Sequence, residues 1–262
     1  MYESAERFYS PRGVLLFGRY ARAYFGRHFT ALRVSRSGPV PSSLTNTILY
    51  ANHPSWWDPM IMLMLAAGPL SNYRVFAPIE AASLERYPIL KRFGLFPLDA
   101  GSLGGHRSFL ETAGQLLESP DNVLAITAQG RFSDPRERPL SLRAGVAHLL
   151  EAYPDRVAIP VALEYTYWND RLPEALVHFG RPVRAERGTG IAHTNKRLDS
   201  ALCEALDALA DRAIERNPGL FDILVGRDRT DLDGIYGLIR RLVSRSKPDR
   251  SSKPKPDAVP RR

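Results

Sequence analysis

Short apolar runs alternate with longer amphipathic stretches along this chain. Apolar runs bounded by Gly, Pro, Asn or Asp are typical of buried strands, and apolar positions every three or four residues are typical of helices. We predict strands at residues 32–35, 47–51, 73–78, 94–98, 123–127, 157–167 and 175–179, the last of the chain. We predict helices at residues 8–30, 60–67, 82–93 with a break at Pro88, 106–118, 141–152 and 194–216.

The alternation of strands and helices predicts an α/β fold with one central, mostly mixed sheet flanked by helices. The pattern leaves the order of the strands open. In such sheets functional groups gather where strands end. His53 follows one predicted strand, Asp99 ends another, and Gln129 with Gly130 follows a third. We therefore expect these side chains to share one cleft.

The segment after the second predicted strand carries the clearest chemical signal. His53 comes directly after the strand, and Asp58 precedes Pro59 where an N-cap residue would begin the next helix. A loop of this length can fold back so that the Asp58 carboxylate accepts the Nδ1–H of His53, which leaves Nε2 as a base. Ser55 is the only nearby hydroxyl and lies inside the loop. The pair therefore suits direct activation of a substrate hydroxyl.

Four blocks of the chain, in order, resemble the glycerolipid (lysophosphatidate-type) acyltransferase family. Residues 52–58 follow its Asn-His-x4-Asp pattern, and residues 94–99, 129–133 and 159–162 resemble its second, third and fourth blocks. A lone histidine is more often a capping or packing residue, but four ordered blocks between about residues 45 and 185 favour catalysis. The resemblance implies a single-domain acyltransferase fold. It also implies acyl transfer from acyl-CoA or acyl carrier protein to a hydroxyl of a lysolipid or another lipid-linked acceptor, with no bound cofactor.

The second and third blocks depart from the family pattern. Gln129 stands where the family has Glu, Phe132 stands where it has Arg with Arg131 one residue away, and Ala100 replaces the Arg of block two. Gln keeps the hydrogen-bonding shape of Glu but adds a donor, and the loss of Arg weakens bidentate phosphate recognition. We therefore expect an altered acceptor pocket. An uncharged or sugar-like hydroxyl acceptor, or an unusual lysolipid, fits it better than simple lysophosphatidic acid.

The resemblance also assigns roles to side chains. His53 would be the general base and Asp58 would orient its ring, so no covalent acyl-enzyme is needed. Backbone N–H groups beside Gly130 would stabilise the oxyanion. The expected substrate-binding residues are Asn52, Ser55, Asp99, Gln129, Gly130, Arg131 and Arg143.

Two of these residues could instead have a purely structural role. Asp99 could cap a turn, and Arg143 could be a surface charge at a helix start. Trp56 and Trp57 are expected to line or pack the cleft, whereas Trp168 is expected to pack at the end of its strand.

Composition narrows the class of protein further. At 262 residues with 44% apolar content the chain can form one core, and the single cysteine, Cys203, excludes a disulfide framework and fits a reducing compartment. The six histidines are scattered, so we expect no metal site. No apolar run is long enough to cross a bilayer and no signal peptide pattern opens the chain.

The positive charge is concentrated at the two ends of the chain. Residues 1–40 carry a net charge of +5 and residues 240–262 carry +7, so within the total of +8 residues 41–239 carry −4. We therefore divide the chain into an amphipathic membrane-interface segment (1–40), an acyltransferase domain (41–239) and a basic, disordered tail (240–262). The expected partner is an anionic membrane surface on the inner, cytoplasmic face of a bacterial cell membrane, where the protein would be peripheral.

The first predicted helix has one aromatic side and one basic side. Its aromatic side carries Val14, Phe17, Ala21, Tyr24 and Phe25, opposite Arg12, Arg19, Arg22 and Arg27. This pattern suits a helix in a membrane interface, and it equally suits a helix docked on the domain by its aromatic face. Nucleic acid is not an expected partner, because no binding motif is present. A catalytically weak lipid- or membrane-binding homologue is the alternative to an active enzyme.

Overall fold

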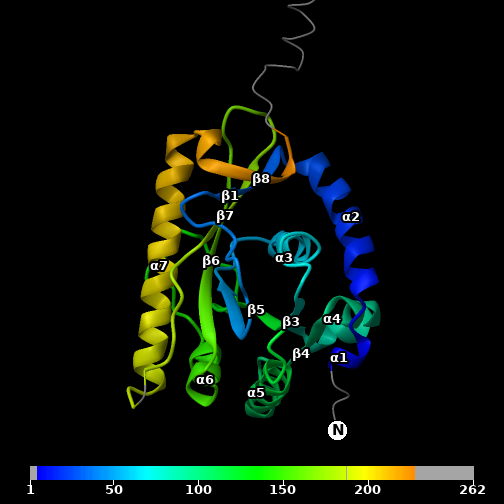
Figure 1. The fold of residues 1–262 in the computed structure, drawn as a ribbon, viewed down its shortest axis with the longest axis vertical. Coiled ribbons are helices and arrows are strands. Elements are labelled where there is room, and N and C mark those ends of the chain that lie inside the picture. Colours follow the sequence, from blue (N-terminus) through cyan, green and yellow to red (C-terminus); the bar gives the residue numbers. More distant parts are fainter. Residues whose placement is uncertain (1–4, 187, 228–262) are drawn as a thin grey trace, which may run out of the picture. The chain divides into compact units, whose positions relative to one another are not determined.

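The computed structural model describes residues 5–186 and 188–227 (Figure 1). Its strands are β1 (Ala31–Ser35), β2 (Thr47–Ala51), β3 (Arg74–Glu80), β4 (Leu95–Leu98), β5 (Asn122–Thr127), β6 (Val157–Thr166), β7 (Glu174–Phe179) and β8 (Phe221–Gly226). Its α-helices are α1 (Ala5–Phe8), α2 (Pro11–His28), α3 (Asp58–Ala66), α4 (Ala81–Arg86), α5 (Leu103–Leu117), α6 (Gly145–Ala152) and α7 (Ile191–Glu215). Two 3₁₀ helices are η1 (Pro88–Phe93) and η2 (Pro218–Leu220). The predicted tail at 240–262 lies outside the described residues.

The eight strands form one sheet in the order β4-β3-β5-β2-β6-β7-β1-β8. The first five strands in this order run parallel to one another. β7 runs antiparallel to β6, β1 runs parallel to β7, and β8 pairs antiparallel with β1. The sheet is therefore mixed and flanked by helices, which confirms the predicted fold class.

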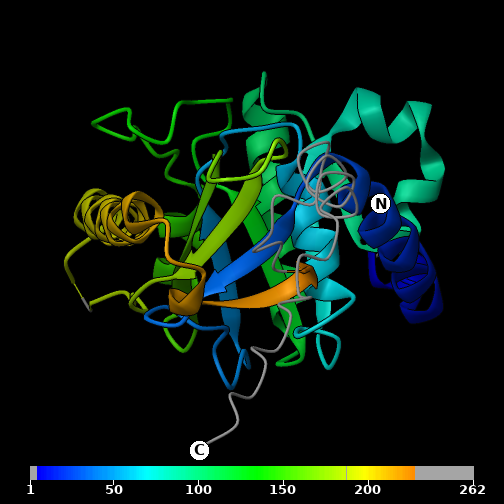
Figure 2. The same cartoon turned by 90° about the horizontal axis from the view of Figure 1, so that it is seen from above.

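Helices bury both faces of the sheet (Figure 2). Ile48 and Tyr50 of β2 belong to the core beneath α5, α6 and α7, whereas Leu49 and Ala51 belong to the core beneath α2 and α3. Successive side chains of a strand point to opposite faces, so a strand buried on both faces is apolar throughout. This explains why the strands leading to the site read as continuous apolar runs in the sequence.

The structure differs from the prediction at three places. β8 was not predicted, so the strand at 175–179 is not the last; the run of β8 is short, and its pairing with β1 defines it as a strand. The predicted helix at 141–152 begins only at Gly145, and Ser141 has a positive φ of 56°. The predicted helix at 8–30 corresponds to α2, which begins only at Pro11, because Ser10 caps its start by accepting a hydrogen bond from the Gly13 N–H at 3.1 Å.

Helix α2 docks on the domain by the side that carries Val14, Ala21 and Phe25, all of which are buried. Gly18 permits the close approach to α3, since a Cβ at this position would lie 2.3 Å from the Cβ of Ala67. β1 follows within the same compact unit and pairs with β7. The residues on both sides of residue 40 thus belong to one compact unit, and the predicted membrane-interface role of the N-terminal segment stays a prediction.

Candidate active site

The site forms where three neighbouring parallel strands end. β2 lies between β5 and β6, and the register pairs Ala51 with Thr127 on one side and with Val161 on the other. Residues that follow these strands at equal distances therefore emerge side by side. This places His53 next to Gln129, as the predicted shared cleft requires, although the two are 76 residues apart in sequence.

His53 and Asp58 form a close pair. The distance from His53 Nδ1 to Asp58 Oδ2 is 2.5 Å, and the Asp58 side chain is 1% exposed while that of His53 is 18% exposed. A carboxylate can only accept, so Nδ1 carries the proton and Nε2 remains available as a base. The predicted contact between the two side chains is present, and their catalytic role stays a prediction.

The predicted N-cap role of Asp58 is wrong. Asp58 is the first residue of α3, the N-cap position belongs to Trp57, and no side chain caps the helix. The Asp58 carboxylate instead turns back into the loop, where Oδ2 also accepts a hydrogen bond from the Ser55 N–H at 3.1 Å. The Asp58 carboxylate therefore holds the loop together by hydrogen bonds and does not cap the helix.

The remaining polar residues of the first block support the loop from within. Asn52 is fully buried, and its amide donates to Leu163 O at 2.9 Å and accepts from Leu163 N at 2.8 Å. The Ser55 hydroxyl accepts a hydrogen bond from the Trp57 N–H at 3.2 Å. Neither Asn52 nor Ser55 is part of the cavity wall. Their observed contacts are structural, and their expected role in substrate binding stays a prediction.

Gln129 holds the backbone of His53 in place. Its Oε1 accepts a hydrogen bond from the His53 N–H at 3.2 Å, and its Nε2 donates to Leu140 O at 3.2 Å. On the other side of the same residue, the Ser133 N–H donates to His53 O at 3.0 Å. Gln129 is 3% exposed and is not part of the cavity wall, so its observed contacts are with the backbone, and the expected contact with the acceptor stays a prediction.

A cavity of about 1720 Å³ opens beside His53 and Asp58. Much of its wall is apolar and comes from α2, α3, β3 and η1. These apolar residues include Phe17, Met62, Leu63, Ala66, Val75, Leu90 and Phe93. Another part of the wall is polar and contains four of the predicted binding residues, which are Asp99, Gly130, Arg131 and Arg143.

The two arginines of this wall have different surroundings. Arg131 forms an ion pair with Glu137, which raises the pKa of the guanidinium and ties it to a surface loop. Arg143 lies against Gly130, where a Cβ would be 2.4 Å from Arg143 Nε and where φ is +64°. In the part of the chain that the structure describes, no carboxylate forms a salt bridge with Arg143. Gly130 is thus needed both for the turn and for the close approach of the arginine.

Asp99 lies in the cavity wall, and its carboxylate forms hydrogen bonds within the turn that follows it. Its carboxylate accepts hydrogen bonds from the Ser102 hydroxyl at 2.6 Å and from the Gly101 N–H at 3.1 Å. These two bonds lower the pKa of the Asp99 carboxyl below its usual range. Asp99 therefore caps this turn, and its expected contact with substrate stays a prediction.

Aromatic side chains frame the pair, and one of them was missed as a contact. The rings of Phe132 and His53 are 4.3 Å apart, and Phe132 is 59% exposed. Its signal in the sequence was its place in block three, where the family has Arg. Trp57 packs on Phe29 with ring centroids 4.9 Å apart, whereas Trp56 is exposed and lines the cavity. Trp168 packs at the end of its strand as predicted, and its indole donates to Ala213 O.

Sequence reasoning also missed Tyr165. Its hydroxyl donates to Asp58 Oδ1 at 2.6 Å, so the carboxylate joins Tyr165 to His53. Tyr165 lies at the end of β6, on the same face as Val161 and Leu163 by strand alternation. That alternation is readable from the sequence. The proximity to Asp58 is not, because it depends on β6 being the neighbour of β2.

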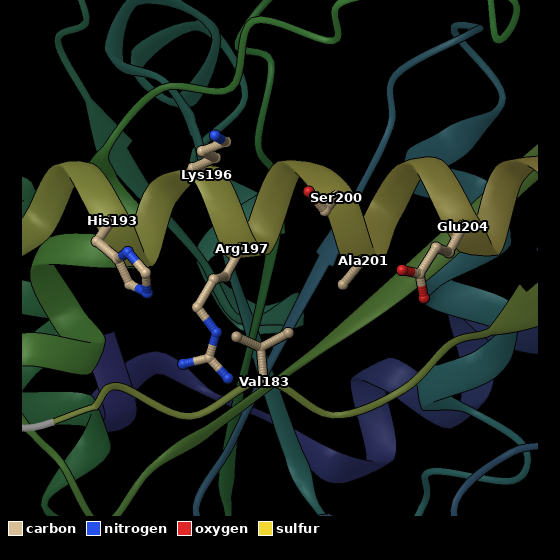
Figure 3. A pocket seen from close by; sticks show the side chains of 7 residues that line it. All are labelled: Val183, His193, Lys196, Arg197, Ser200, Ala201 and Glu204. Atoms are coloured by element: carbon tan, nitrogen blue, oxygen red, sulfur yellow. The ribbon is translucent and has the colours of Figure 1, made fainter. Parts of the chain in front are cut away.

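A second, smaller hollow of about 400 Å³ lies on α7 and shares no residue with the cavity beside His53 (Figure 3). In this view Arg197 extends from the helix toward Val183. Arg197 pairs with Glu186 at 3.0 Å and donates to Arg184 O at 2.9 Å. Its guanidinium is therefore engaged within the protein.

Among the residues that the structure describes, no group of three or more His, Cys, Asp or Glu side chains is arranged to hold a metal ion. Within the same ranges, none of the helices combines the length and the apolar character needed to cross a membrane.

A histidine paired with a buried carboxylate at the wall of a large cavity is the arrangement of an enzyme that uses a general base. A family model described as acyltransferase matches residues 32–164, which is half of the chain. The chain therefore belongs to the acyltransferase family. No curated protein sequence matches it.

A solved acyltransferase structure has a similar fold. The 1-acyl-sn-glycerophosphate (LPA) acyltransferase PlsC from Thermotoga maritima is similar with a TM-score of 0.51 and 16% identity, over 76% of this chain and 79% of that chain. At this identity the likeness shows the fold alone. The ATPase DotB from Legionella pneumophila has a TM-score of 0.37 and 12% identity, over 82% of this chain and 67% of that chain. That score is too low to carry an argument about the fold.

Proposed function

We propose that this acyltransferase transfers a fatty acyl group from an acyl thioester to a hydroxyl of a lysolipid or another lipid-linked acceptor. The observation that carries the proposal is the 2.5 Å contact between His53 Nδ1 and the buried Asp58 carboxylate beside a cavity with a largely apolar wall. The contact fixes the imidazole with Nε2 as the free base, and the apolar wall suits an acyl chain.

In the proposed reaction, Nε2 of His53 takes the proton from the acceptor hydroxyl as its oxygen attacks the thioester carbonyl. Asp58 stabilises the imidazolium that forms. The tetrahedral oxyanion would be stabilised by backbone N–H groups beside Gly130. It collapses to the new ester, and the C–S bond breaks. The leaving thiolate takes the proton from the imidazolium and leaves as a thiol, so no acyl-enzyme forms.

The donor would lie along the apolar part of the cavity, with its acyl chain between α2, α3 and η1. Phe17, Leu63 and Phe93 contribute to this wall. Both acyl-CoA and acyl carrier protein carry the same thioester on a pantetheine arm, so either donor is compatible with this arrangement. Neither requires a bound cofactor.

The acceptor would approach over Phe132. The ring of Phe132 lies against His53, and the neighbouring Arg131 is tied to Glu137. This leaves Arg143 as the cation of the cavity wall that no described carboxylate pairs with. An aromatic ring beside the reacting hydroxyl favours an uncharged or sugar-like acceptor, or an unusual lysolipid, over simple lysophosphatidic acid.

The protein would meet its lipid substrates at an anionic membrane surface, on the inner face of a bacterial cell membrane. The outer side of α2 supports this proposal, because Leu15, Leu16 and Tyr20 are exposed there together with Arg12 and Arg19. Exposed apolar side chains among arginines suit the interface of an anionic bilayer. We expect flotation with vesicles to require anionic lipid and to fall in a Leu16→Ser variant. Ile214→Ser, a matched change on α7, should leave flotation unchanged; equal flotation of both variants contradicts the proposal.

The enzymatic proposal is tested by acyl transfer from labelled acyl-CoA and labelled acyl carrier protein. The acceptors are lysophosphatidate, lysophospholipids, an ornithine lysolipid and glycosylated lipids. His53→Ala should reduce transfer by about 10²–10⁴-fold, the usual contribution of a general base. His193→Ala on α7 makes the same chemical change away from the cavity and should retain activity. Transfer that persists in His53→Ala contradicts the mechanism, and no transfer to any acceptor by the folded wild type favours a lipid-binding protein.

A further inference from the structure

A third side chain completes the polar contacts of the His53–Asp58 pair. The Tyr165 hydroxyl donates to Asp58 Oδ1 at 2.6 Å, while Asp58 Oδ2 accepts from His53 Nδ1. Each carboxylate oxygen thus accepts from a different side chain: Tyr165, at the end of β6, or His53, which follows β2. The plane of the carboxylate is held at both oxygens.

Burial makes the tyrosine contact difficult to replace. Asp58 is 1% exposed, so bulk water does not reach its carboxylate freely. Oδ2 has a second donor in the Ser55 N–H, whereas Tyr165 is the donor that the described residues offer to Oδ1. A buried carboxylate oxygen without a donor costs free energy, and the carboxylate would reorient to recover one.

The register between β2 and β6 sets the position of Tyr165 along its strand relative to His53. Both backbone groups of Leu163 are bound by Asn52, which immediately precedes His53. Tyr165 follows Leu163 by two residues, so its side chain leaves β6 on the same face. Its ring lies 5.7 Å from that of Phe29, which limits its movement on the other side. Asn52 therefore ties the positions of Tyr165 and His53 to each other.

The hydroxyl acts as a donor in this contact. Burial, followed by the negative charge of Asp58 and the hydrogen bond to it, raises the pKa of Tyr165 well above its ordinary value. The phenol therefore stays protonated over the range in which the protein is folded and active. A protonated phenol can donate to Asp58 without adding a second negative charge.

We propose that Tyr165 is a positioning residue of the acyltransferase, which fixes the Asp58 carboxylate so that Oδ2 faces His53 Nδ1 while the imidazole takes up and returns the proton. The inference rests on the proposed function of His53. Tyr165 makes no contact with the reacting atoms in this role, and it acts through Asp58. Loss of the hydroxyl should then affect turnover more than substrate binding.

The first test compares Tyr165→Phe with two tyrosine controls in the full chain. We expect kcat to fall about 10- to 100-fold in Tyr165→Phe with little change in KM, since hydrogen bonds to charged groups are among the strongest. Tyr50→Phe removes another buried hydroxyl bond, to Leu198 O at 3.0 Å, and should lower thermal stability but not kcat. Tyr167→Phe removes an exposed hydroxyl nearby and should change neither quantity. An unchanged kcat in Tyr165→Phe, or an equal fall in Tyr50→Phe, overturns the inference.

The second test does not depend on activity. A proton held between Nδ1 and a carboxylate gives a far-downfield ¹H signal, which His53→Ala should abolish. Tyr165→Phe should shift or broaden this signal while Tyr50→Phe leaves it in place. If no acceptor is ever acylated, this signal still decides the role of Tyr165, so the two proposals fail separately. An identical signal in wild type and Tyr165→Phe contradicts the inference.

Discussion

The two sides of the cavity are built in different ways. On the side of His53 the polar groups are buried and bound to one another, as Asn52, Asp58 and Gln129 are. On the side of the expected acceptor they are exposed, and Arg131 pairs with Glu137 at the surface. Phe132 lies between the two sides, with one contact to His53 and a mostly exposed ring.

The two departures from the family pattern lie on different sides of the cavity, one buried and one exposed. Gln129 differs from the family Glu on the buried side, where its amide both accepts from His53 N–H and donates to Leu140 O. A carboxylate could perform only the first of these tasks. Phe132 differs from the family Arg on the exposed side, where the side chain is free to meet a substrate. We therefore predict that the first departure affects stability and the second affects the choice of acceptor.

The largest effect that would test this comparison is expected at Gln129. Gln129→Ala leaves the His53 N–H and the Leu140 carbonyl without a partner, and it should lower the free energy of unfolding by about 2–4 kcal/mol. Gln129→Glu keeps an acceptor for His53 but puts a carboxylate against the Leu140 carbonyl, so we expect a loss of about 1–3 kcal/mol. Chemical denaturation measures both values, and acyl transfer should fall in parallel.

An exposed glutamine provides the matched control for Gln129. Gln115→Ala on α5 should change the free energy of unfolding by less than about 0.5 kcal/mol. The assignment of Gln129 to stability is wrong if Gln129→Ala unfolds at the same denaturant concentration as the wild type. It is also wrong if only the KM for the acceptor changes.

A smaller effect, confined to substrate choice, is expected at Phe132. Phe132→Arg restores the family guanidinium and should raise kcat/KM for lysophosphatidate relative to a neutral acceptor about tenfold, because a charge-assisted bond to phosphate becomes available. Phe132→Leu keeps an apolar side chain and should give no such gain. Competition between the two acceptors for one labelled donor measures the ratio. A fall in total activity with an unchanged ratio would contradict a role in specificity.

Much of the fold was predictable because its signals are local. The strand before His53 and the helix that contains Pro59 follow from short-range patterns that the structure reproduces. β8 was missed although Ile223, Leu224 and Val225 are apolar, because so short a run is ambiguous by itself and its pairing with β1 defines it as a strand. The contact between His53 and Asp58 was predictable as well, since five residues separate them.

The sequence by itself determined most of the elements, the family and the pair at its first block. The tertiary structure decided which polar residues face the cavity and which are buried beneath it. Gln129 reaches His53 over 76 residues, and Tyr165 reaches Asp58 over 107 residues. Both contacts exist because β2 lies between β5 and β6, and strand order depends on the packing of the whole sheet rather than on any local pattern. Burial then fixes the roles, because a buried polar group must find its partner inside the protein.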